Sequence, residues 1–266
     1  MLTIYQEVGL HMTKMFISDL HLEEDRPEIT NIFLLFLQRC AKEADTLYIL
    51  GDFFEAWIGD DDLTPFHLQI IQALFQATQQ GLKIYFMRGN RDFLIGKKFL
   101  RASGCQLLSD EHVINIANTP ILLMHGDTLC TEDKAYLKFR KKARCWLVQQ
   151  IFLLKSLEKR REIAKRYRDA SKVHTSTAPD YLMDVTQAEV ERVMLKHGAY
   201  HLIHGHTHRP NVHSFQLNGL PATRTVLAAW HDEGSVLVIK ENGERGIVVL
   251  PQIHKSPPGQ LAGGEG

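Results

Sequence analysis

Aspartate and histidine gather in five short segments of this 266-residue chain, and each segment directly follows a short apolar run. Carboxylates, imidazoles and side-chain amides are the groups with which proteins bind divalent metals. In chain order the candidate ligands are Asp19, His21, Asp52, Asn90, His125, His204, His206 and His208. Each segment alone is a weak signal, because such residues also form turns and helix caps. Together they indicate a metal centre.

The segment from His204 to His208 carries three histidines in five residues, too many for all of them to be ordinary core histidines. On an extended segment the three imidazoles would lie on one side, whereas a turn at Gly205 would change that. Imidazole is the commonest ligand of borderline transition metals. We therefore expect this segment to bind metal.

The apolar runs that precede the five clusters are typical of buried strands. They are residues 15–17, 47–50, 84–87, 121–124 and 202–203. Amphipathic helices are predicted over Ile29–Ala41 and Phe66–Gln80. Alternating strands and helices predict an α/β fold with its site beyond the carboxyl ends of the strands, so all five clusters should share one rim. The runs Thr225–Ala229, Ser235–Ile239 and Gly246–Leu250 predict antiparallel strands.

In this order, the clusters resemble those of the calcineurin-like metallophosphoesterases, whose pattern is D-x-H, G-D, G-N-[H/R], H and G-H-x-H. The resemblance extends from Met15 to about Pro251. It implies an α/β fold of four layers, an αββα sandwich of two stacked sheets flanked by helices, with a two-metal site. His204 matches no ligand position and is expected either to support the metal ligands without binding metal or to be structural.

The resemblance assigns the metal ligands residue by residue. One metal is held by Asp19, His21, Asp52 and His208, and the second by Asp52, Asn90, His125 and His206, with Asp52 bridging. Two cations about 3.5–4 Å apart can lower the pKa of a shared water and hold a phosphoryl oxygen during in-line attack. The mixed nitrogen and oxygen ligands suit two Mn²⁺ ions, with iron, zinc or magnesium as alternatives.

Arg91 carries information about the bond that is cleaved. Many relatives have histidine in this position, where it can protonate an alkoxide leaving group. Arginine cannot act as a general acid at neutral pH but can neutralise an anionic oxygen, which favours a pyrophosphate substrate. Alternatively, Arg91 pairs structurally with Asp92 or Glu55. The predicted catalytic residues are Asp52, Asn90, Arg91 and His125.

Four longer stretches, Gly51–Asp61, Gly89–Gly96, Met124–Thr131 and His204–Pro210, resemble the branch of this family that acts in lipid A biosynthesis. That resemblance implies attack at the α-phosphorus of UDP-2,3-diacylglucosamine, which gives UMP and 2,3-diacylglucosamine 1-phosphate. The implied substrate contacts are Asn90, Arg91, Asp133, Ser171, Thr175 and His206. The position of Thr175 is often asparagine in relatives, and Ala178 replaces an expected lysine, for which Lys172 or another cation could substitute.

The formal net charge of zero hides two opposed regions. Residues 131–172 contain fourteen Lys and Arg but only five Asp and Glu, so this block is basic within an acidic body. We expect residues 131–184 to form a helical cap inserted between core segments 15–130 and 185–251, with flexible termini at 1–14 and 252–266. The apolar stretch Trp146–Leu154, among cations that include Arg160 and Arg161, predicts peripheral binding to the cytoplasmic face of the inner membrane. The alternative is a solvated helix face.

Other features of the sequence exclude some classes of function. No apolar run approaches the about 20 residues that span a bilayer. Four widely spaced cysteines and the lack of an evident signal peptide predict free thiols in the cytoplasm. A soluble nucleotide phosphodiesterase or dinucleoside polyphosphatase is the main alternative. A metal-free scaffold protein would not need the full set of ligands, which is present here. A nuclease is disfavoured because the basic block contains more bulky aliphatic side chains than aromatic side chains on which bases could stack. The sequence gives no indication of oligomeric state.

Overall fold

The computed structural model describes residues 13–177, 179, 182 and 184–251. The elements of the first half are β1 (Thr13–Ile17), α1 (Pro27–Glu43), β2 (Thr46–Leu50), α2 (Pro65–Gln79), β3 (Lys83–Met87), α3 (Lys97–Ser103), β4 (Gln106–Leu107), β5 (Glu111–Ile116) and β6 (Thr119–Met124). The two predicted helices are α1 and α2, and each begins at a proline, whose fixed φ suits a first helical turn. The predicted flexible termini lie outside the described residues, except that Thr13 and Lys14 belong to β1.

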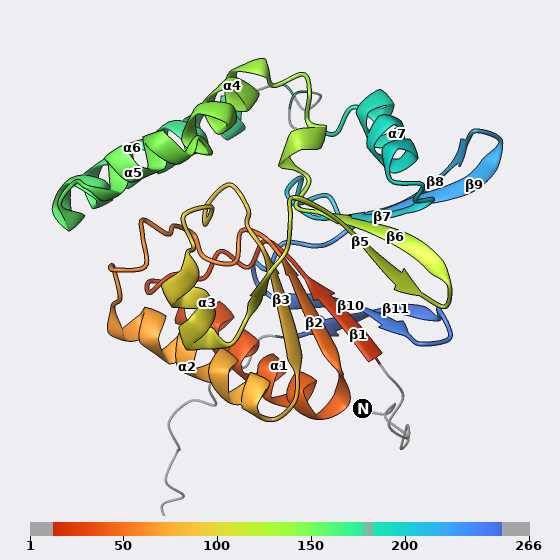
Figure 1. Ribbon diagram of the computed structural model, residues 1–266, viewed down its shortest axis with the longest axis horizontal. Coiled ribbons are helices and arrows are strands. Elements are labelled where there is room, and N and C mark those ends of the chain that lie inside the picture. Colours follow the sequence, from red (N-terminus) through yellow and green to blue (C-terminus); the bar gives the residue numbers. More distant parts are fainter. Residues whose placement is uncertain (1–12, 178, 180–181, 183, 252–266) are drawn as a thin grey trace, which may run out of the picture.

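Two β-sheets stack against each other at the centre of the molecule (Figure 1). The first has the order β11-β10-β1-β2-β3-β4, in which β1 to β4 are parallel and β10 is antiparallel to both of its neighbours. The second has the order β5-β6-β7-β9-β8. The later elements of the core are α7 (Gln187–Lys196), β7 (His201–His204), β8 (Asn211–Leu217), β9 (Leu220–Val226), β10 (Gly234–Lys240) and β11 (Arg245–Leu250).

Successive residues of the central strands face different layers, because side chains alternate along a strand. In β1, Met15 and Ile17 belong to the apolar core shared with α1 and α2, whereas Phe16 packs between the two sheets. On the outer face of the second sheet, α7 contributes Val190 and Met194 to a third core. The order helix, sheet, sheet, helix confirms the predicted αββα sandwich.

The described residues between the short helix η1 (Asp127–Leu129) and α7 leave the sandwich and form a cap above the rim of the sheets (Figure 1). The cap consists of α4 (Lys134–Ala143), α5 (Trp146–Leu153) and α6 (Leu157–Thr177). The chain leaves and re-enters the core at one place, since the Thr186 N–H donates to the Leu129 carbonyl at 2.9 Å. No helix among the described residues is long and apolar enough to cross a membrane.

Some expectations are wrong in detail. The strand predicted at Thr225–Ala229 is β9, which covers Leu220–Val226, so residues 227–229 follow the strand. The strands β5 and β8 carry no strong pattern because both are edge strands of mixed polarity. Arg160, expected among the membrane-facing cations, is only 2% exposed and is directed at the core.

Candidate metal centre

The seven predicted ligands lie after the carboxyl ends of five strands, on the rim that faces the cap. They are Asp19 and His21 after β1, Asp52 after β2, Asn90 after β3, His125 after β6, and His206 and His208 after β7. The rim predicted from the strand pattern is therefore present, and it brings together side chains that are almost 190 residues apart in the sequence.

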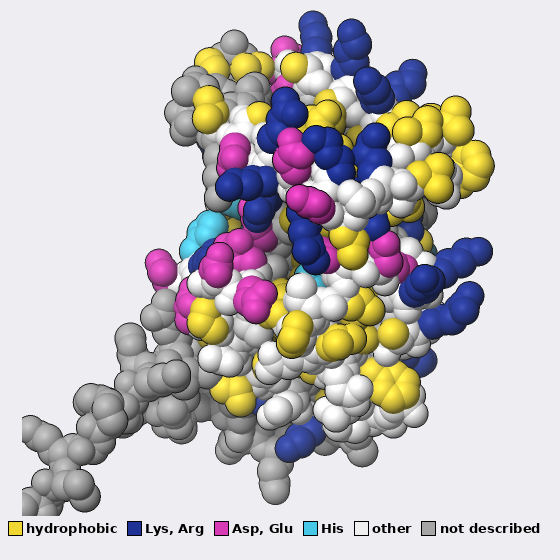
Figure 2. All heavy atoms as spheres, turned by 90° about the vertical axis from the view of Figure 1, so that its left-hand side faces the viewer, with side chains coloured by type: hydrophobic (Ala, Val, Ile, Leu, Met, Phe, Trp, Pro, Cys, Tyr) yellow, Lys and Arg dark blue, Asp and Glu magenta, His cyan; other side chains and the backbone are white. Residues whose placement is uncertain are grey.

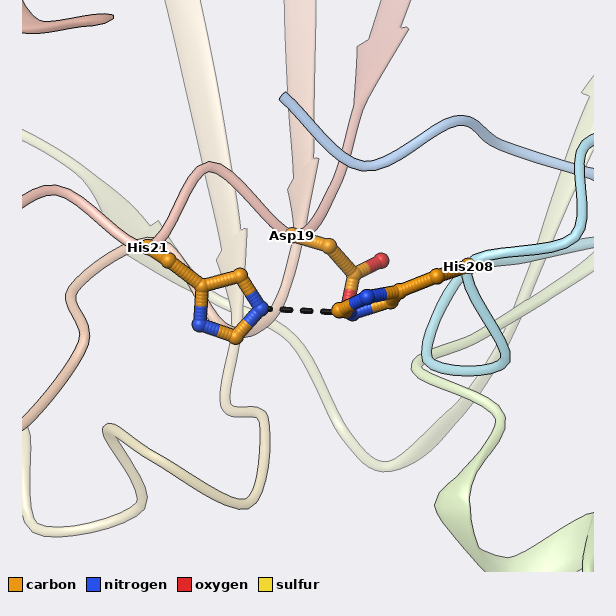
Figure 3. Close-up of side chains that lie close together, drawn as sticks. All are labelled: Asp19, His21 and His208. Carbon is orange, nitrogen blue, oxygen red and sulfur yellow. Dashed lines mark hydrogen bonds and ion pairs between the residues drawn. The ribbon is translucent and has the colours of Figure 1, made fainter. Parts of the chain in front are cut away.

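The first group of ligands consists of Asp19, His21 and His208, whose ligand atoms all lie within 4.8 Å of one another. His208 Nε2 is 3.4 Å from Asp19 Oδ1 and 3.3 Å from His21 Nε2. Figure 3 shows the three side chains pointing toward a common centre from two separate loops. One carboxylate oxygen and two imidazole nitrogens at this spacing suit a borderline divalent cation.

The second group consists of Asp52, His125 and His206, which also lie within 4.8 Å of one another. His125 Nε2 is 3.6 Å from Asp52 Oδ1 and 2.9 Å from Asn90 Oδ1, so an amide oxygen joins this group. His125 Nδ1 is 2.8 Å from the Leu50 carbonyl, which can only accept a hydrogen bond. Nδ1 therefore carries a proton, and Nε2 is the nitrogen that faces the other ligands and can bind a metal.

Asp52 lies between the two groups. Its Oδ1 faces His125, and its Oδ2 lies 3.9 Å from His21 Nε2. The backbone N–H of Arg91 donates to Oδ1 at 2.8 Å and fixes the carboxylate. A carboxylate whose two oxygens face different groups has the geometry needed to bridge two ions.

The buried carboxylate of Asp19 has an unmet acceptor. Its Oδ2 accepts hydrogen bonds from the Ser18 hydroxyl at 2.5 Å and the His206 N–H at 2.9 Å. Its Oδ1 accepts none from the described part of the chain. Burial opposes ionisation, but His208, whose Nε2 lies 3.4 Å from Oδ1, and the charges of nearby histidines keep the pKa of Asp19 well below its ordinary value. A buried anionic oxygen without a donor is well suited to a cation.

The histidines respond to the same negative charge. Burial disfavours the protonated forms of His21 and His125. The pKa of each is nevertheless raised, because Glu55 forms a hydrogen bond with His21 and the negative charge of Asp52 acts on both histidines. Burial, reinforced by the charge of His125, lowers the pKa of His206 to about 4. His206 is therefore neutral at physiological pH and offers a lone pair. The buried carboxylates thus attract positive charge to this site, as expected of residues that bind two metal ions.

The backbone is strained at five ligands. The φ angles are 56° at Asp19, 49° at His21, 49° at Asp52, 68° at His206 and 54° at His208, all in the left-handed region. This conformation costs a residue with a side chain about 1–2 kcal/mol. Strain at so many ligands indicates that the fold holds them in place for function.

Two glycines permit the close approach of these loops. A Cβ atom on Gly89 would lie 2.1 Å from Asp52 Oδ1 and 2.2 Å from the Asp52 backbone nitrogen. A Cβ atom on Gly205 would lie 2.1 Å from Asp19 Oδ2. Any other residue at these positions would displace a ligand.

Comparison with known proteins agrees with this geometry. A family model described as calcineurin-like phosphoesterase matches residues 12–210. The chain belongs to the calcineurin-like phosphoesterase family. A UDP-2,3-diacylglucosamine hydrolase of Azotobacter vinelandii is 48% identical over 236 residues, which are 87% of this chain and 96% of that protein. A protein of the same name from Pseudomonas aeruginosa is 50% identical over 234 residues, 88% of this chain and 98% of the relative.

Among solved structures, an archaeal phosphodiesterase aligns with a TM-score of 0.47 at 13% identity, and the alignment covers 90% of this chain and 100% of that one. A two-metal centre fits both the calcineurin-like phosphoesterase family and the two ligand groups.

On the cap side of this calcineurin-like phosphoesterase, two of the predicted substrate contacts meet. Arg91 Nη2 donates to Ser171 Oγ on α6 at 3.3 Å, while the buried Arg91 Nε has no partner among the described residues. Arg91 forms no ion pair with Asp92 or Glu55 within the described chain. Asp92 instead accepts backbone N–H groups, and Glu55 lies 2.9 Å from His21 Nδ1.

The structure supports the other predicted substrate contacts on the cap side less directly. Asp133 is buried and caps α4, because its Oδ1 accepts the Tyr136 N–H at 2.8 Å. Thr175 belongs to α6, but its side chain is not among those that the structure describes, and Ala178 lies outside the described residues. The structure thus brings Arg91 and Ser171 together and does not locate the Thr175 side chain.

His204 is separated from the other histidines because β7 ends there and the chain turns at Gly205. Its Nδ1 lies 2.8 Å from the Gly205 carbonyl, and Arg224 donates to its Nε2 at 3.2 Å. Burial lowers the pKa of His204 to about 3. His204 therefore remains a neutral structural residue, as its mismatch with the family pattern implies.

Two carboxylates support the ligands in a way that the sequence did not predict. Glu55 orients His21 from the side opposite the ligand group. Asp127 accepts the Tyr136 hydroxyl at 2.5 Å and Arg140 Nε at 2.6 Å, which ties α4 to the segment that carries His125. The sequence could have indicated both residues by their position, because each acid lies within three residues of a predicted ligand in an otherwise apolar stretch.

Proposed function

We propose that this protein hydrolyses the pyrophosphate bond of UDP-2,3-diacylglucosamine in lipid A biosynthesis. Water attacks the α-phosphorus, the bond to the bridging oxygen breaks, and UMP and 2,3-diacylglucosamine 1-phosphate leave. The observation that carries the proposal is a pair of ligand groups that meet at Asp52 beside Arg91. Relatives with about half of their residues identical bear the name of this activity.

Two Mn²⁺ ions are the proposed cofactors, with Asp19, His21, Asp52 and His208 around one and Asp52, Asn90, His125 and His206 around the other. When bound, such cations polarise a phosphoryl oxygen and lower the pKa of the attacking water. The nitrogen and oxygen donors suit manganese. The proposed role of Asp52 is to connect the two ligand groups. The proposed role of His125 and Asn90 is to position the substrate phosphate beside the metal ions.

Arg91 is the proposed electrostatic partner of the phosphates. Its guanidinium keeps its proton at neutral pH, so it neutralises charge and does not donate a proton. This chemistry suits a phosphate leaving group, which is stable as an anion. The unmet Nε of Arg91 offers a hydrogen bond that a phosphate oxygen can accept. His206, Asp133, Ser171 and Thr175 are the further proposed contacts.

A cavity between the core and the cap is the proposed site for an acyl chain. It is lined by Ala56, Trp57, Ile58, Asp62, His67, Arg161, Ala164 and Arg168. The β2–α2 loop and α6 contribute apolar atoms to its walls, and Asp62, Arg161 and Arg168 contribute charged groups. The apolar part of this lining, formed by Ala56, Trp57, Ile58 and Ala164, is what favours a lipid over a soluble dinucleotide.

The outer surface of the cap is the proposed membrane contact. Trp146, Leu147, Ile151 and Leu154 are 71%, 58%, 53% and 87% exposed. Figure 2 shows hydrophobic side chains beside Lys and Arg over this part of the molecule, above a band of acidic and histidine side chains. Apolar side chains among cations favour the surface of an anionic membrane. We accordingly propose peripheral association with the cytoplasmic face of the inner membrane.

The activity is tested by incubating the purified protein with Mn²⁺, detergent and UDP-2,3-diacylglucosamine, and measuring UMP. We expect UMP release that Asp52→Asn abolishes without changing the circular dichroism spectrum. Faster hydrolysis of a dinucleoside polyphosphate than of the lipid would contradict the assignment.

Membrane binding is tested by co-sedimentation with vesicles that contain phosphatidylglycerol. We expect the double variant Trp146→Ser, Leu154→Ser to lose at least about 10-fold in affinity, because two large apolar side chains leave the interface. The matched control is Leu35→Ser, which removes a 46% exposed leucine from α1, the helix on the opposite side of the first sheet from the cap (Figure 1). Equal binding by the two variants would exclude the cap as the contact.

A further inference from the structure

Three consecutive aspartates, Asp60–Asp62, lie in the loop that joins β2 to α2, and each makes a different contact. Asp60 accepts the backbone N–H groups of Gly96 and Lys98 at the start of α3, both at 2.9 Å. It also accepts the indole N–H of Trp57 at 3.1 Å. Asp60 thus fixes the loop to the core, which leaves its two neighbours in a defined position toward the cap.

Asp61 binds Arg160, in the first turns of α6, through both carboxylate oxygens. Arg160 Nη1 is 2.8 Å from Asp61 Oδ1 and 2.8 Å from the Ile58 carbonyl, and Nη2 donates to Asp61 Oδ2. Arg160 Nε donates to the Lys155 carbonyl at 3.1 Å. The guanidinium is only 2% exposed, so a charged side chain of the cap is enclosed by a loop of the core.

Asp62 binds Arg161, the next residue of α6. Arg161 Nη2 donates to Asp62 Oδ1, and Nε donates to Asp62 Oδ2 at 3.4 Å. Both residues line the cavity between core and cap. Two adjacent aspartates therefore bind two adjacent arginines that lie 99 residues further along the chain.

The same helix reaches the metal centre at its other end. Ser171 of α6 accepts the hydrogen bond from Arg91, and Arg168 Nη1 lies 3.9 Å from Glu23 Oε2. At about 1.5 Å of rise per residue, Ser171 lies about 16 Å along the helix from Arg160. A small change in tilt at the first turns therefore displaces the residues over the metal centre.

We propose that Asp61–Arg160, assisted by Asp62–Arg161, is a clasp that sets the tilt of α6 and so makes the enzyme selective for the diacylated substrate. The choice of substrate rests on the proposed function. These are positioning residues that do not touch the reacting atoms. The pair with Arg160 dominates, because loss of Asp61 leaves an enclosed guanidinium without its ion-pair partner, whereas the Arg161 side chain is 58% exposed and solvent can replace Asp62.

Lipid substrates and small substrates should depend on the clasp to different extents. A diacylated substrate needs both the cavity wall formed by α6 and the contacts near Ser171, so release of the clasp weakens its binding. A small phosphodiester such as bis(p-nitrophenyl) phosphate needs only the metal centre. Loss of the clasp therefore affects KM for the lipid and leaves hydrolysis of the small substrate unchanged.

The experiment uses the full chain loaded with Mn²⁺ and the variants Arg160→Gln and Asp61→Asn. We expect each to raise amide exchange in residues 157–171 about 10-fold, because α6 opens more often. KM for UDP-2,3-diacylglucosamine should rise about 10-fold with kcat within about 3-fold, as expected when binding alone is lost. Because the Asp61 side chain is 50% exposed, Asp61→Asn should remain folded if Arg160→Gln does not. The double variant should be no worse than Arg160→Gln.

The control is Arg192→Gln, which breaks an ion pair of 2.7 Å with Glu189 on the surface of α7. It should change none of these readouts. Unchanged exchange in α6, or an equal fall in activity on both substrates, would overturn the clasp. If the wild type cleaves the small diester but not the lipid while the variants still loosen α6, the proposed function fails and the mechanical role of the clasp stands.

Discussion

Arg91 and Ser171 connect the sandwich to the cap, since Arg91 Nη2 donates to Ser171 Oγ at 3.3 Å. Arg91 directly follows the amide ligand Asn90, and its own backbone N–H holds the Asp52 carboxylate. One residue therefore contacts the centre of the candidate metal site and the inserted helix together. This relationship makes Arg91 the point where phosphate chemistry and substrate enclosure meet.

Replacement of Arg91 tests its electrostatic role. We expect Arg91→Ala to lower kcat/KM for UDP-2,3-diacylglucosamine about 100-fold, as expected when a preorganised charge is removed from a transition state. Two metal ions per chain should remain bound, because only the backbone of Arg91 contacts a ligand. Steady-state kinetics and elemental analysis measure both quantities. Arg101→Ala, which removes an exposed arginine of α3, is the control, and a loss below about 3-fold in Arg91→Ala would contradict the role.

Gly89 tests the need for close approach at the metal centre. Gly89→Ala should place a methyl group on the Asp52 carboxylate and backbone, and we expect loss of metal binding and activity. Gly246→Ala is the matched control, because nothing lies within 4 Å of a Cβ atom built there. Isothermal titration with Mn²⁺ compares the two variants. Wild-type affinity in Gly89→Ala would show that the loop tolerates a side chain.

The four cysteines should differ sharply in reactivity. Cys40, Cys105 and Cys130 are buried, whereas Cys145 is exposed. Burial raises the pKa of Cys105 and of Cys130 to about 12, which removes the reactive thiolate near neutral pH. We expect a thiol reagent to label Cys145 alone in the native protein and all four cysteines after denaturation. Peptide mapping provides the check, and rapid native labelling of Cys130 would be inconsistent with this packing.

Asp127 should link stability to pH. Burial opposes its ionisation, but the charges of His125, Arg140 and His206 and the Tyr136 hydroxyl hold its pKa well below the ordinary value of 3.8. A lowered pKa in the folded state means that the carboxylate stabilises the fold above about pH 4, and that this contribution is lost as the pH falls further.

We therefore expect Asp127→Asn to lower the free energy of unfolding by about 1.5–3 kcal/mol near pH 7, because the partly buried Arg140 keeps its ion pair with Asp110 but loses the one with Asp127. The difference from the wild type should shrink at about pH 3. Urea denaturation of the metal-free protein at both pH values measures it. A difference that does not change with pH would mean that packing, and not charge, explains the loss.

The site was more predictable than the sheets that carry it. Ligands such as Asp52 and His125 follow buried parallel strands, whose continuous apolar runs are easy to recognise. Edge strands carry weaker patterns, which is why β8 was not predicted. In β9, Pro221 near the start of the strand obscured its true beginning.

Contacts between distant segments were beyond prediction. Arg160 looks like one more exposed cation in a basic helix, and only the folded chain places it against Asp61, 99 residues earlier. The left-handed backbone at Asp19 and His208 is equally invisible in the sequence, because Asp and His adopt it at only a small fraction of their positions. Local patterns thus predicted which residues come together at the rim, and packing determined how they are held.

The most direct test of the central claim is hydrolysis of UDP-2,3-diacylglucosamine in water enriched in oxygen-18, followed by mass spectrometry of both products. Attack at the α-phosphorus predicts one heavy oxygen in UMP and none in 2,3-diacylglucosamine 1-phosphate. Label in the lipid phosphate, or no turnover of the lipid by metal-loaded protein that cleaves a small diester, would contradict the account.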